Sequence, residues 1–146
     1  MQKTASAGYL MNHIARQFAI LLNEGLSPLG VSPAQFPILL TLWEKDGLSQ
    51  HDLVAIADLK QATIANTLAR MERDGLIVRT AHPTDARSRA IWLTDKAKAL
   101  QEKATAIAQA INQTALSVLT DDEQVAFIEM MNKVVAQQKV MMREKR

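Results

Sequence analysis

The sequence of this chain has no cysteine and no apolar run long enough to cross a membrane. Without thiols it forms no disulfide bonds, zinc–thiolate sites or iron–sulfur clusters, and it has no cysteine nucleophile or thiol redox switch. A membrane-spanning helix needs ~20 consecutive apolar residues, and the first eight residues lack the charged and apolar regions of a secretion signal. We therefore expect a soluble, cytoplasmic protein that needs no cofactor.

Aromatic residues are also scarce, at 4% of 146 residues. Alanine, leucine, isoleucine and methionine supply most of the 48% hydrophobic content, which favours helices over strands. The length is that of one domain. The net charge of +2 is unevenly distributed, because residues 60–92 hold six Lys or Arg against three Asp or Glu. This basic segment indicates a surface that contacts a polyanion.

Apolar residues at helical spacing predict a series of helices. We expect helices over residues 9–23, 33–46, 49–58 and 60–74, a long helix from residue 95 and a last helix from residue 121. Capping-box patterns mark the helix starts at Ser32 with Gln35, Ser49 with Asp52, and Thr120 with Glu123. Helix-ending residues are Gly25, Pro28 and Gly30 for the first helix, Gly47 and Gly75. The residues expected to face the core from the middle three helices are Phe36, Leu39, Leu40, Trp43, Leu53, Ile56, Ile64, Leu68 and Met71.

The helices over residues 49–58 and 60–74 are joined by a very short turn, which is the layout of a helix-turn-helix. Residues 76–80 and 90–93 are apolar and β-branched, so they predict two strands. Between them, residues 81–89 form a basic tip that holds Asp85, Arg87 and Arg89. In this order the elements predict a winged helix-turn-helix within a mostly α fold that has a small β-wing.

The long helix that opens at Thr94 and Asp95 carries a heptad seam. The members of the seam are Ala97, Leu100, Ala104, Ile107, Ile111 and Val118, with Thr114 in the gap. Such a seam needs a partner, which is either the first and last helices of the same chain or the terminal helices of a second copy. We favour the second copy and therefore predict a symmetric homodimer.

The second helix of a winged helix-turn-helix enters the major groove of DNA, where short polar side chains meet base edges. With Ile64, Leu68 and Met71 inward, the residues on or beside the open face are Lys60, Gln61, Ala62, Thr63, Asn66, Thr67, Arg70 and Arg73. The amides of Asn66 and Gln61 can pair with adenine, and the lysine and arginines can hold phosphates. The alternative is that these are ordinary solvated residues, with Arg70 paired to Asp74.

The stretch from residue 61 to residue 77, followed by Asp85-Ala86-Arg87 and Leu93-Thr94, resembles the MarR family of bacterial transcription regulators. The shared pattern is a reading helix that ends in Gly-Leu-Ile, an Asp-x-Arg wing and a Leu-Thr junction before the long helix. The resemblance implies a homodimer that reads a near-palindromic operator. It also implies that Arg87 enters the minor groove, that Asp85 braces the wing and that Arg89 contacts a phosphate. Ala86 departs from the pattern, because many relatives carry a second basic residue there.

Members of this family often release DNA when a small aromatic or phenolic acid binds between the dimer region and the winged module. By position, the candidates for lining such a cleft are His13, Arg16, Phe36 and Trp43. The alternative is that Phe36 and Trp43 are core residues and that His13 is a surface histidine. No metal site is expected, because the three histidines are not paired near an acidic cluster.

These observations predict a single domain, with residues 1–29 and 95–146 forming a dimerisation region and residues 30–94 the winged module. The predicted function is sequence-specific binding of double-stranded DNA by a bacterial repressor, nucleoid-associated when bound and released by a small aromatic ligand. An enzyme is not expected, since no glycine-rich phosphate loop, nucleophile elbow or His-Glu-x-x-His motif is present. The alternative is a winged-helix protein-interaction module that does not read DNA. Arg87, Arg89 and Asn66 argue against that alternative.

Overall fold

The computed structural model describes residues 1–81, 84 and 89–145. By their contacts these residues form two compact units, Met1–Ala108 and Gln109–Arg146. The first unit contains the helix-turn-helix, a three-stranded antiparallel sheet and most of the core, and the second contains the last turns of one long helix and all of the next. The predicted fold class, mostly α with a small β-wing, is confirmed.

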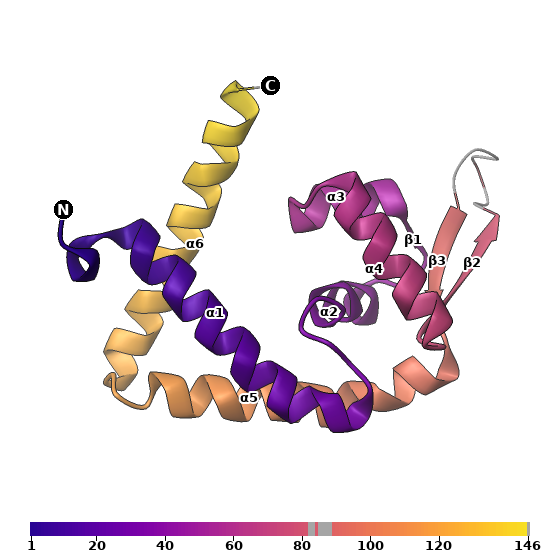
Figure 1. Ribbon diagram of the computed structural model, residues 1–146, viewed down its shortest axis with the longest axis horizontal. Helices are drawn as coiled ribbons and strands as arrows, with labels where there is room; N and C mark the ends of the chain where they lie inside the picture. Colours follow the sequence, from indigo (N-terminus) through magenta and orange to yellow (C-terminus); the bar gives the residue numbers. More distant parts are fainter. Residues whose placement is uncertain (82–83, 85–88, 146) are drawn as a thin grey trace. The chain divides into compact units, whose positions relative to one another are not determined.

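The elements follow one another in the predicted order (Figure 1). The two 3-10 helices are η1 (Lys3–Ala5) and η2 (Ser27–Leu29). The α-helices are α1 (Ala7–Leu26), α2 (Phe36–Glu44), α3 (Gln50–Ala57), α4 (Gln61–Arg73), α5 (Asp95–Leu116) and α6 (Asp121–Glu144). The strands are β1 (Leu48–Ser49), β2 (Ile77–Ala81) and β3 (Arg89–Leu93). No helix in the described part of the chain is long and apolar enough to cross a membrane.

The helix ends show how far local sequence determines this fold. All three expected capping boxes form, as reciprocal hydrogen bonds between Ser32 and Gln35, Ser49 and Asp52, and Thr120 and Glu123. The helix α4 ends at Gly75 as predicted, because this glycine adopts a φ of 75° and the N–H of Leu76 donates to the carbonyl of Met71 at 2.9 Å. The first helix ends within the expected Gly25, Pro28 and Gly30, since α1 stops at Leu26, the 3-10 helix η2 contains Pro28, and Gly30 follows with a φ of 75°.

The sheet has the order β1-β3-β2, with antiparallel pairing throughout. The short strand β1 was not predicted, because two residues carry no period of their own. In the pairing of β2 with β3, Arg79 lies opposite Ile91 and Ala81 lies opposite Arg89. Residues opposite one another share a face, and so do residues two apart on a strand. Arg79 and Arg89 are therefore diagonal neighbours on one face of the sheet.

The core of the first unit is organised around α4, whose Ile64, Leu68 and Met71 are fully buried as predicted. Two core predictions are wrong. Leu40 is 40% exposed and Ile56 is 52% exposed. The buried arc of α2 runs instead through Ile38, Leu39 and Leu42 and ends short of Leu40, and α3 turns the side of Leu53 inward and Ile56 outward.

The long helices bury little of their apolar surface within one chain. On α5, Ala97 and Ala104 of the predicted seam are buried, whereas Val118 is 85% exposed because the helix ends two residues earlier. None of the described residues of α6 is buried. The large apolar side chains exposed on α1 and α6 are Tyr9, Leu10, Met11, Ile14, Ile20, Leu21, Val125, Ile128, Met130, Met131, Val134, Val135, Val140, Met141 and Met142.

A close packing contact fixes the turn before β1. Gly47 has a φ of 76°, and a Cβ atom added to it would lie 2.5 Å from the ring of Trp92. Asp46 Oδ1 accepts hydrogen bonds from the N–H groups of Gly47 at 3.0 Å and Leu93 at 2.9 Å, and Trp92 Nε1 donates to Thr80 Oγ1 at 2.9 Å. The hydrogen bonds of Asp46 hold the backbone of this turn, and the bond to Thr80 holds the Trp92 ring that packs against it.

We predict that Gly47→Ala lowers the free energy of unfolding by about 2–3 kcal/mol, because it adds an overlap with Trp92 to the strain of a positive φ. The matched control is Gly30→Ala, where φ is 75° but nothing lies within 4 Å of the added Cβ. This control should cost only about 1 kcal/mol. Urea denaturation of both variants measures the difference, and equal costs would contradict the overlap.

Candidate nucleic-acid interface

The open side of α4 is divided into three lines of residues. Since successive residues of a helix are 100° apart, the line that points away from the buried Ile64, Leu68 and Met71 consists of Ala62, Asn66, Ala69 and Arg73, and all four are exposed. Thr63, Thr67 and Arg70 follow one flank of the helix, and Gln61, Ala65 and Glu72 follow the other. Of the residues predicted for the reading face of α4, only Thr67 is not exposed.

The two flanks have different surroundings. Thr67 is half-buried, and its hydroxyl donates to the carbonyl of Thr63 within the same helix at 2.9 Å. Lys60, the N-cap residue of α4, is exposed and makes no capping hydrogen bond through its side chain. On the other flank, Gln61 and Glu72 face the sheet rather than the open side, as their contacts with a pocket and with Arg79 show.

The carboxyl end of α4 is attached to its neighbours through Asp74. Gln35, which is only 4% exposed, donates from Nε2 to Asp74 Oδ2 at 3.0 Å. Lys96 Nζ donates to the Asp74 carbonyl at 2.9 Å. The same Gln35 accepts the Ser32 N–H through Oε1, so one amide side chain both closes the turn before α2 and holds the end of α4.

The alternative pairing of Arg70 with Asp74 is not the one that forms. Asp74 Oδ1 accepts instead from Arg73 Nε at 3.2 Å, and the Arg73 side chain remains 70% exposed. Hydrogen bonds from Gln35 and then Arg73 lower the pKa of Asp74 from its ordinary value of 3.8. Asp74 is therefore an ionised anchor, and Arg70 keeps its side chain exposed on the flank of α4.

The strands β2 and β3 form the hairpin that follows α4 in the chain (Figure 1). Arg89, at the first position of β3, is exposed. The expected wing residues Asp85 and Arg87 lie outside the described residues. The structure therefore locates the base of the hairpin and Arg89, and the roles of Asp85 and Arg87 stay predictions.

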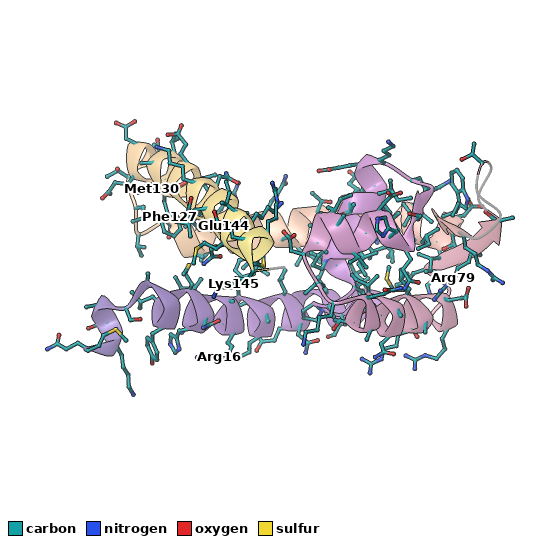
Figure 2. The ribbon with its side chains drawn as sticks, turned by 90° about the horizontal axis from the view of Figure 1, so that it is seen from above. Arg16, Arg79, Phe127, Met130, Glu144 and Lys145 are labelled. Atoms are coloured by element: carbon teal, nitrogen blue, oxygen red, sulfur yellow. The ribbon has the colours of Figure 1, made fainter. Side chains whose placement is uncertain are left out.

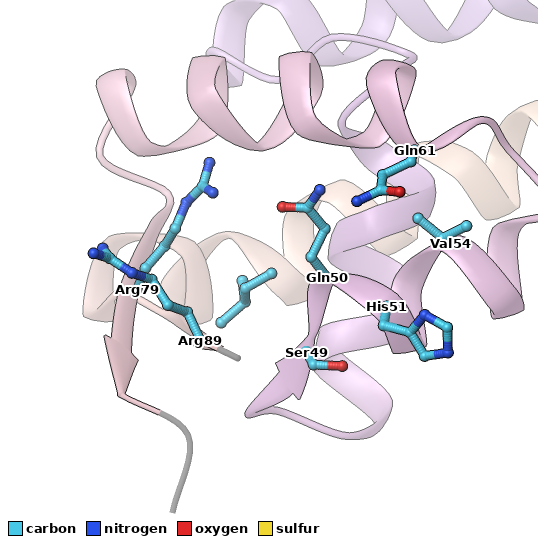
Figure 3. A pocket seen from close by; sticks show the side chains of 8 residues that line it. Ser49, Gln50, His51, Val54, Gln61, Arg79 and Arg89 are labelled. Atoms are coloured by element: carbon cyan, nitrogen blue, oxygen red, sulfur yellow. The ribbon is translucent and has the colours of Figure 1, made fainter. Parts of the chain in front are cut away.

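A polar pocket of about 380 Å³ lies between this hairpin and the two short helices (Figure 3). Its lining residues are Ser49, Gln50, His51, Val54, Gln61, Arg79, Arg89 and Ile91. Arg79 was missed by the sequence analysis, although its place on β2, two residues after the buried Ile77, puts it on the inward side of a predicted strand. In Figure 2 it lies beside α4.

The four candidates for a ligand cleft fall into two pairs with different surroundings. Phe36 is 4% exposed and meets Trp43 edge to face at 6.1 Å, and Trp43 Nε1 donates to the Ala97 carbonyl at 3.1 Å. These are contacts of core residues. His13 stacks on Tyr9 with ring centroids 5.6 Å apart, and Arg16 extends from α1 as an exposed side chain (Figure 2).

The helix pair, the three-stranded sheet and the open face of α4 define a winged helix-turn-helix protein. The model of the MarR family matches residues 31–88. The transcriptional regulator HosA of Escherichia coli O111:H- is 32% identical over 101 residues, which are 69% of this chain and 75% of HosA. The chain belongs to the MarR family. HosA is a transcriptional regulator, and the prediction that the chain is not an enzyme is confirmed.

Two solved structures of regulators are similar along most of the chain. The transcriptional repressor CouR, bound to a 23-mer DNA duplex, has a TM-score of 0.82 and 25% identity, over 90% of this chain and 94% of CouR. The PcaV transcriptional regulator from Streptomyces coelicolor, in complex with its natural ligand, has a TM-score of 0.81 and 25% identity, over 93% of this chain and 96% of PcaV. The fold of this chain is therefore shared with regulators in DNA-bound and ligand-bound states.

The lowered pKa of Asp74 predicts a pH dependence of stability. Because the folded-state pKa lies below the ordinary value of 3.8, the contribution of Asp74 is complete above that value and is lost as the pH falls through the folded pKa. The difference in unfolding free energy between wild type and Asp74→Asn should therefore stay constant above about pH 5 and shrink as the pH falls below 3.8.

Gln35→Ala tests the cause of the lowered pKa of Asp74 while leaving the Asp74 carboxylate in place. Because the Gln35 hydrogen bond is its largest cause, the variant should raise the pKa of Asp74 toward the ordinary value. A ¹³C NMR titration of the Asp74 carboxyl measures the change. An unaltered midpoint in Gln35→Ala would show that the bond does not hold the carboxylate.

Proposed function

We propose that this chain is a transcriptional regulator that binds double-stranded DNA by placing α4 in the major groove. The observation that carries the proposal is the outward line of α4, where Asn66 stands between the small Ala62 and Ala69, with the basic Arg73 at the end and all four exposed. The amide of Asn66 can donate to and accept from an adenine edge, and Ala62 lets the helix approach the bases closely. A buried helix face on the opposite side holds this line in a fixed orientation.

Phosphate contacts supply the sequence-independent part of the affinity. We assign them to the exposed Lys60, Arg70, Arg73 and Arg89, with the hydroxyl of Thr63 as a further donor. We place Gln61 on the flank of α4 that faces the sheet. We assign Thr67 the role of supporting Thr63, through the hydrogen bond from its hydroxyl to the Thr63 carbonyl. From the family pattern, Arg87 enters the minor groove and Asp85 orients it.

The chain binds DNA as a homodimer. α1 and α6 expose more large apolar side chains than the surface of a monomeric protein normally carries. A second copy of the chain supplies matching helices that cover both. Two reading helices related by a two-fold axis then meet two half-sites of a near-palindromic operator. Residues 1–29 and 95–146 serve as the dimerisation region and residues 30–94 as the winged module.

The regulator acts as a repressor, and a small aromatic acid releases it from DNA. The support is the likeness to CouR, a repressor bound to a duplex, and to PcaV, which is bound to its natural ligand. His13 and Arg16 are the exposed groups that we assign to a ligand carboxylate. Phe36 and Trp43 are held by core contacts, so we leave them out of this ligand site.

Binding to a mixed-sequence duplex, followed by fluorescence anisotropy over a range of salt, tests the proposal. We expect affinity to fall steeply with salt, because each phosphate contact releases counterions. No binding at low salt would leave the protein-interaction module as the function. Repeating the titration in the presence of substituted benzoic acids tests whether a ligand releases the protein from DNA. An unchanged affinity for DNA with every acid of the series would contradict release by an aromatic acid.

Selection of binding sites from a random pool tests the reading role of Asn66. Asn66→Ala should relax preference at one base pair per half-site, at a cost of about 1–3 kcal/mol for the preferred base. The matched control is Asn112→Ala, which removes the same amide from an exposed position on a different helix, α5. Identical selected sites for Asn66→Ala and wild type would contradict this role.

The dimer is tested on α6. Met131→Lys and Val135→Lys each place a charge on the apolar side of this helix and should shift the protein from dimer to monomer in sedimentation equilibrium. Ala136→Lys adds the same charge on the side of α6 that carries Glu129 and Lys133 and should leave the dimer intact. Monomeric wild type at micromolar concentration, or dimeric lysine variants, would count against the assembly.

A further inference from the structure

Arg79 is the most unusual charged residue in the described part of the chain. Its side chain is only 21% exposed, and its Nε atom is buried without a hydrogen-bond partner among the described residues. The nearest carboxylate, Glu72 Oε2, lies 3.6 Å from Nε, which is too far for a good hydrogen bond. A buried guanidinium N–H without an acceptor costs free energy, so this position indicates an acceptor that arrives from outside.

The surroundings of Arg79 suit an anion. Arg89 stands on the same face of the sheet as its diagonal neighbour, and both arginines line the pocket of about 380 Å³. None of the eight described lining residues is acidic. Figure 3 shows Gln50 and Gln61 extending toward one another, across the pocket from the two arginines. Two cations and two amides therefore line one polar space.

The first turn of α3 adds donors to the same space. Ser49 and Asp52 form the capping box of this helix, which occupies their N–H groups. The N–H groups of the residues between them, Gln50 and His51, have no acceptor within a helix, because the first four N–H groups of any helix lack one. Both residues line the pocket. An anion in the pocket would therefore meet donors from the sheet, from α3 and from α4.

We propose that this pocket binds one phosphate of the DNA backbone, with Arg79 as its main ligand and Arg89, Gln50 and Gln61 around it. The inference rests on the proposed function and adds a contact that the outward face of α4 does not supply. A phosphodiester fits better than a flat carboxylate, because its tetrahedral oxygens offer acceptors to donors on several sides. The pocket lies on the sheet-facing flank of α4, beside its first residue, so the bound phosphate fixes the depth of that helix in the groove.

Glu72 has a defined part in this arrangement. In the free protein its carboxylate, which is 51% exposed, is the nearest counter-charge to Arg79. Because the pair is loose, a phosphate can replace Glu72 without breaking a short hydrogen bond. Arg79 is thus held in place before DNA arrives and gains its acceptor on binding.

The first test is the salt dependence of binding to a mixed-sequence duplex. Arg79→Gln should weaken binding about tenfold and reduce the magnitude of the slope of log affinity against log salt by about 0.9, the value for one phosphate. Arg79→Lys should keep most of the slope, because it retains the charge. Lys45→Gln, which removes one charge from an exposed position outside the dimerisation region and the assigned contacts, should leave the slope unchanged. Circular dichroism checks that each variant is folded.

A double-mutant cycle separates a phosphate ligand from a structural arginine. Glu72→Gln should strengthen binding in the wild-type background, because it removes the competitor of the phosphate. It should have a smaller effect in the Arg79→Gln background. Equal effects of Glu72→Gln in both backgrounds would overturn the proposed exchange.

The Nε–H resonance of Arg79, assigned by its absence in Arg79→Lys, reports on the pocket directly. Added duplex should shift this resonance, and inorganic phosphate should shift it only at much higher concentration. A shift with inorganic phosphate but not with duplex would assign the pocket to a small phosphate compound and overturn the inference. If wild type binds duplex with normal salt dependence while Arg79→Gln does the same, the inference fails and the proposed function stands. If wild type binds no duplex, both fail.

Discussion

The structure depends on one constraint, the complete burial of a single face of α4. Ile64, Leu68 and Met71 are each inaccessible, and burying side chains of this size stabilises the fold by about 2 kcal/mol each. The Gly75 turn and the Gln35–Asp74 hydrogen bond then hold the carboxyl end of the helix against α2. Because one side of α4 is fixed so firmly, the opposite side has a defined direction. A helix that rolled by one residue would lose both the core contacts and the reading line.

The local features of the fold could be read from the sequence because they depend on neighbouring residues. Ser49 and Asp52 are three positions apart, so their capping box follows from spacing alone. Gly75 marks the end of α4 because a helix that ends in a left-handed residue favours glycine there. The errors at Leu40 and Ile56 have a different origin. Each residue lies at the edge of the apolar arc of its helix. Which edge becomes buried depends on the elements that pack against the helix and not on the sequence of the helix itself.

The same distinction applies to the candidate site. The outward positions of Asn66 and Arg73 followed from the buried stripe of α4 by geometry. The sequence did not reveal that Gln61 faces the sheet or that Arg79 lines a pocket with Arg89, because these depend on how β2 and β3 pack beside α4. Asp85 and Arg87 lie outside the described residues, and their assignment depends on the family pattern.

The exposed apolar helices have a consequence for how the protein responds to its own abundance. If α1 and α6 are covered only in the dimer, association contributes part of the folding free energy, and stability rises with the amount of chain present. Occupancy of an operator then varies with the square of the protomer concentration wherever the monomer predominates. A modest change in synthesis or turnover would be amplified into a sharper change in transcription.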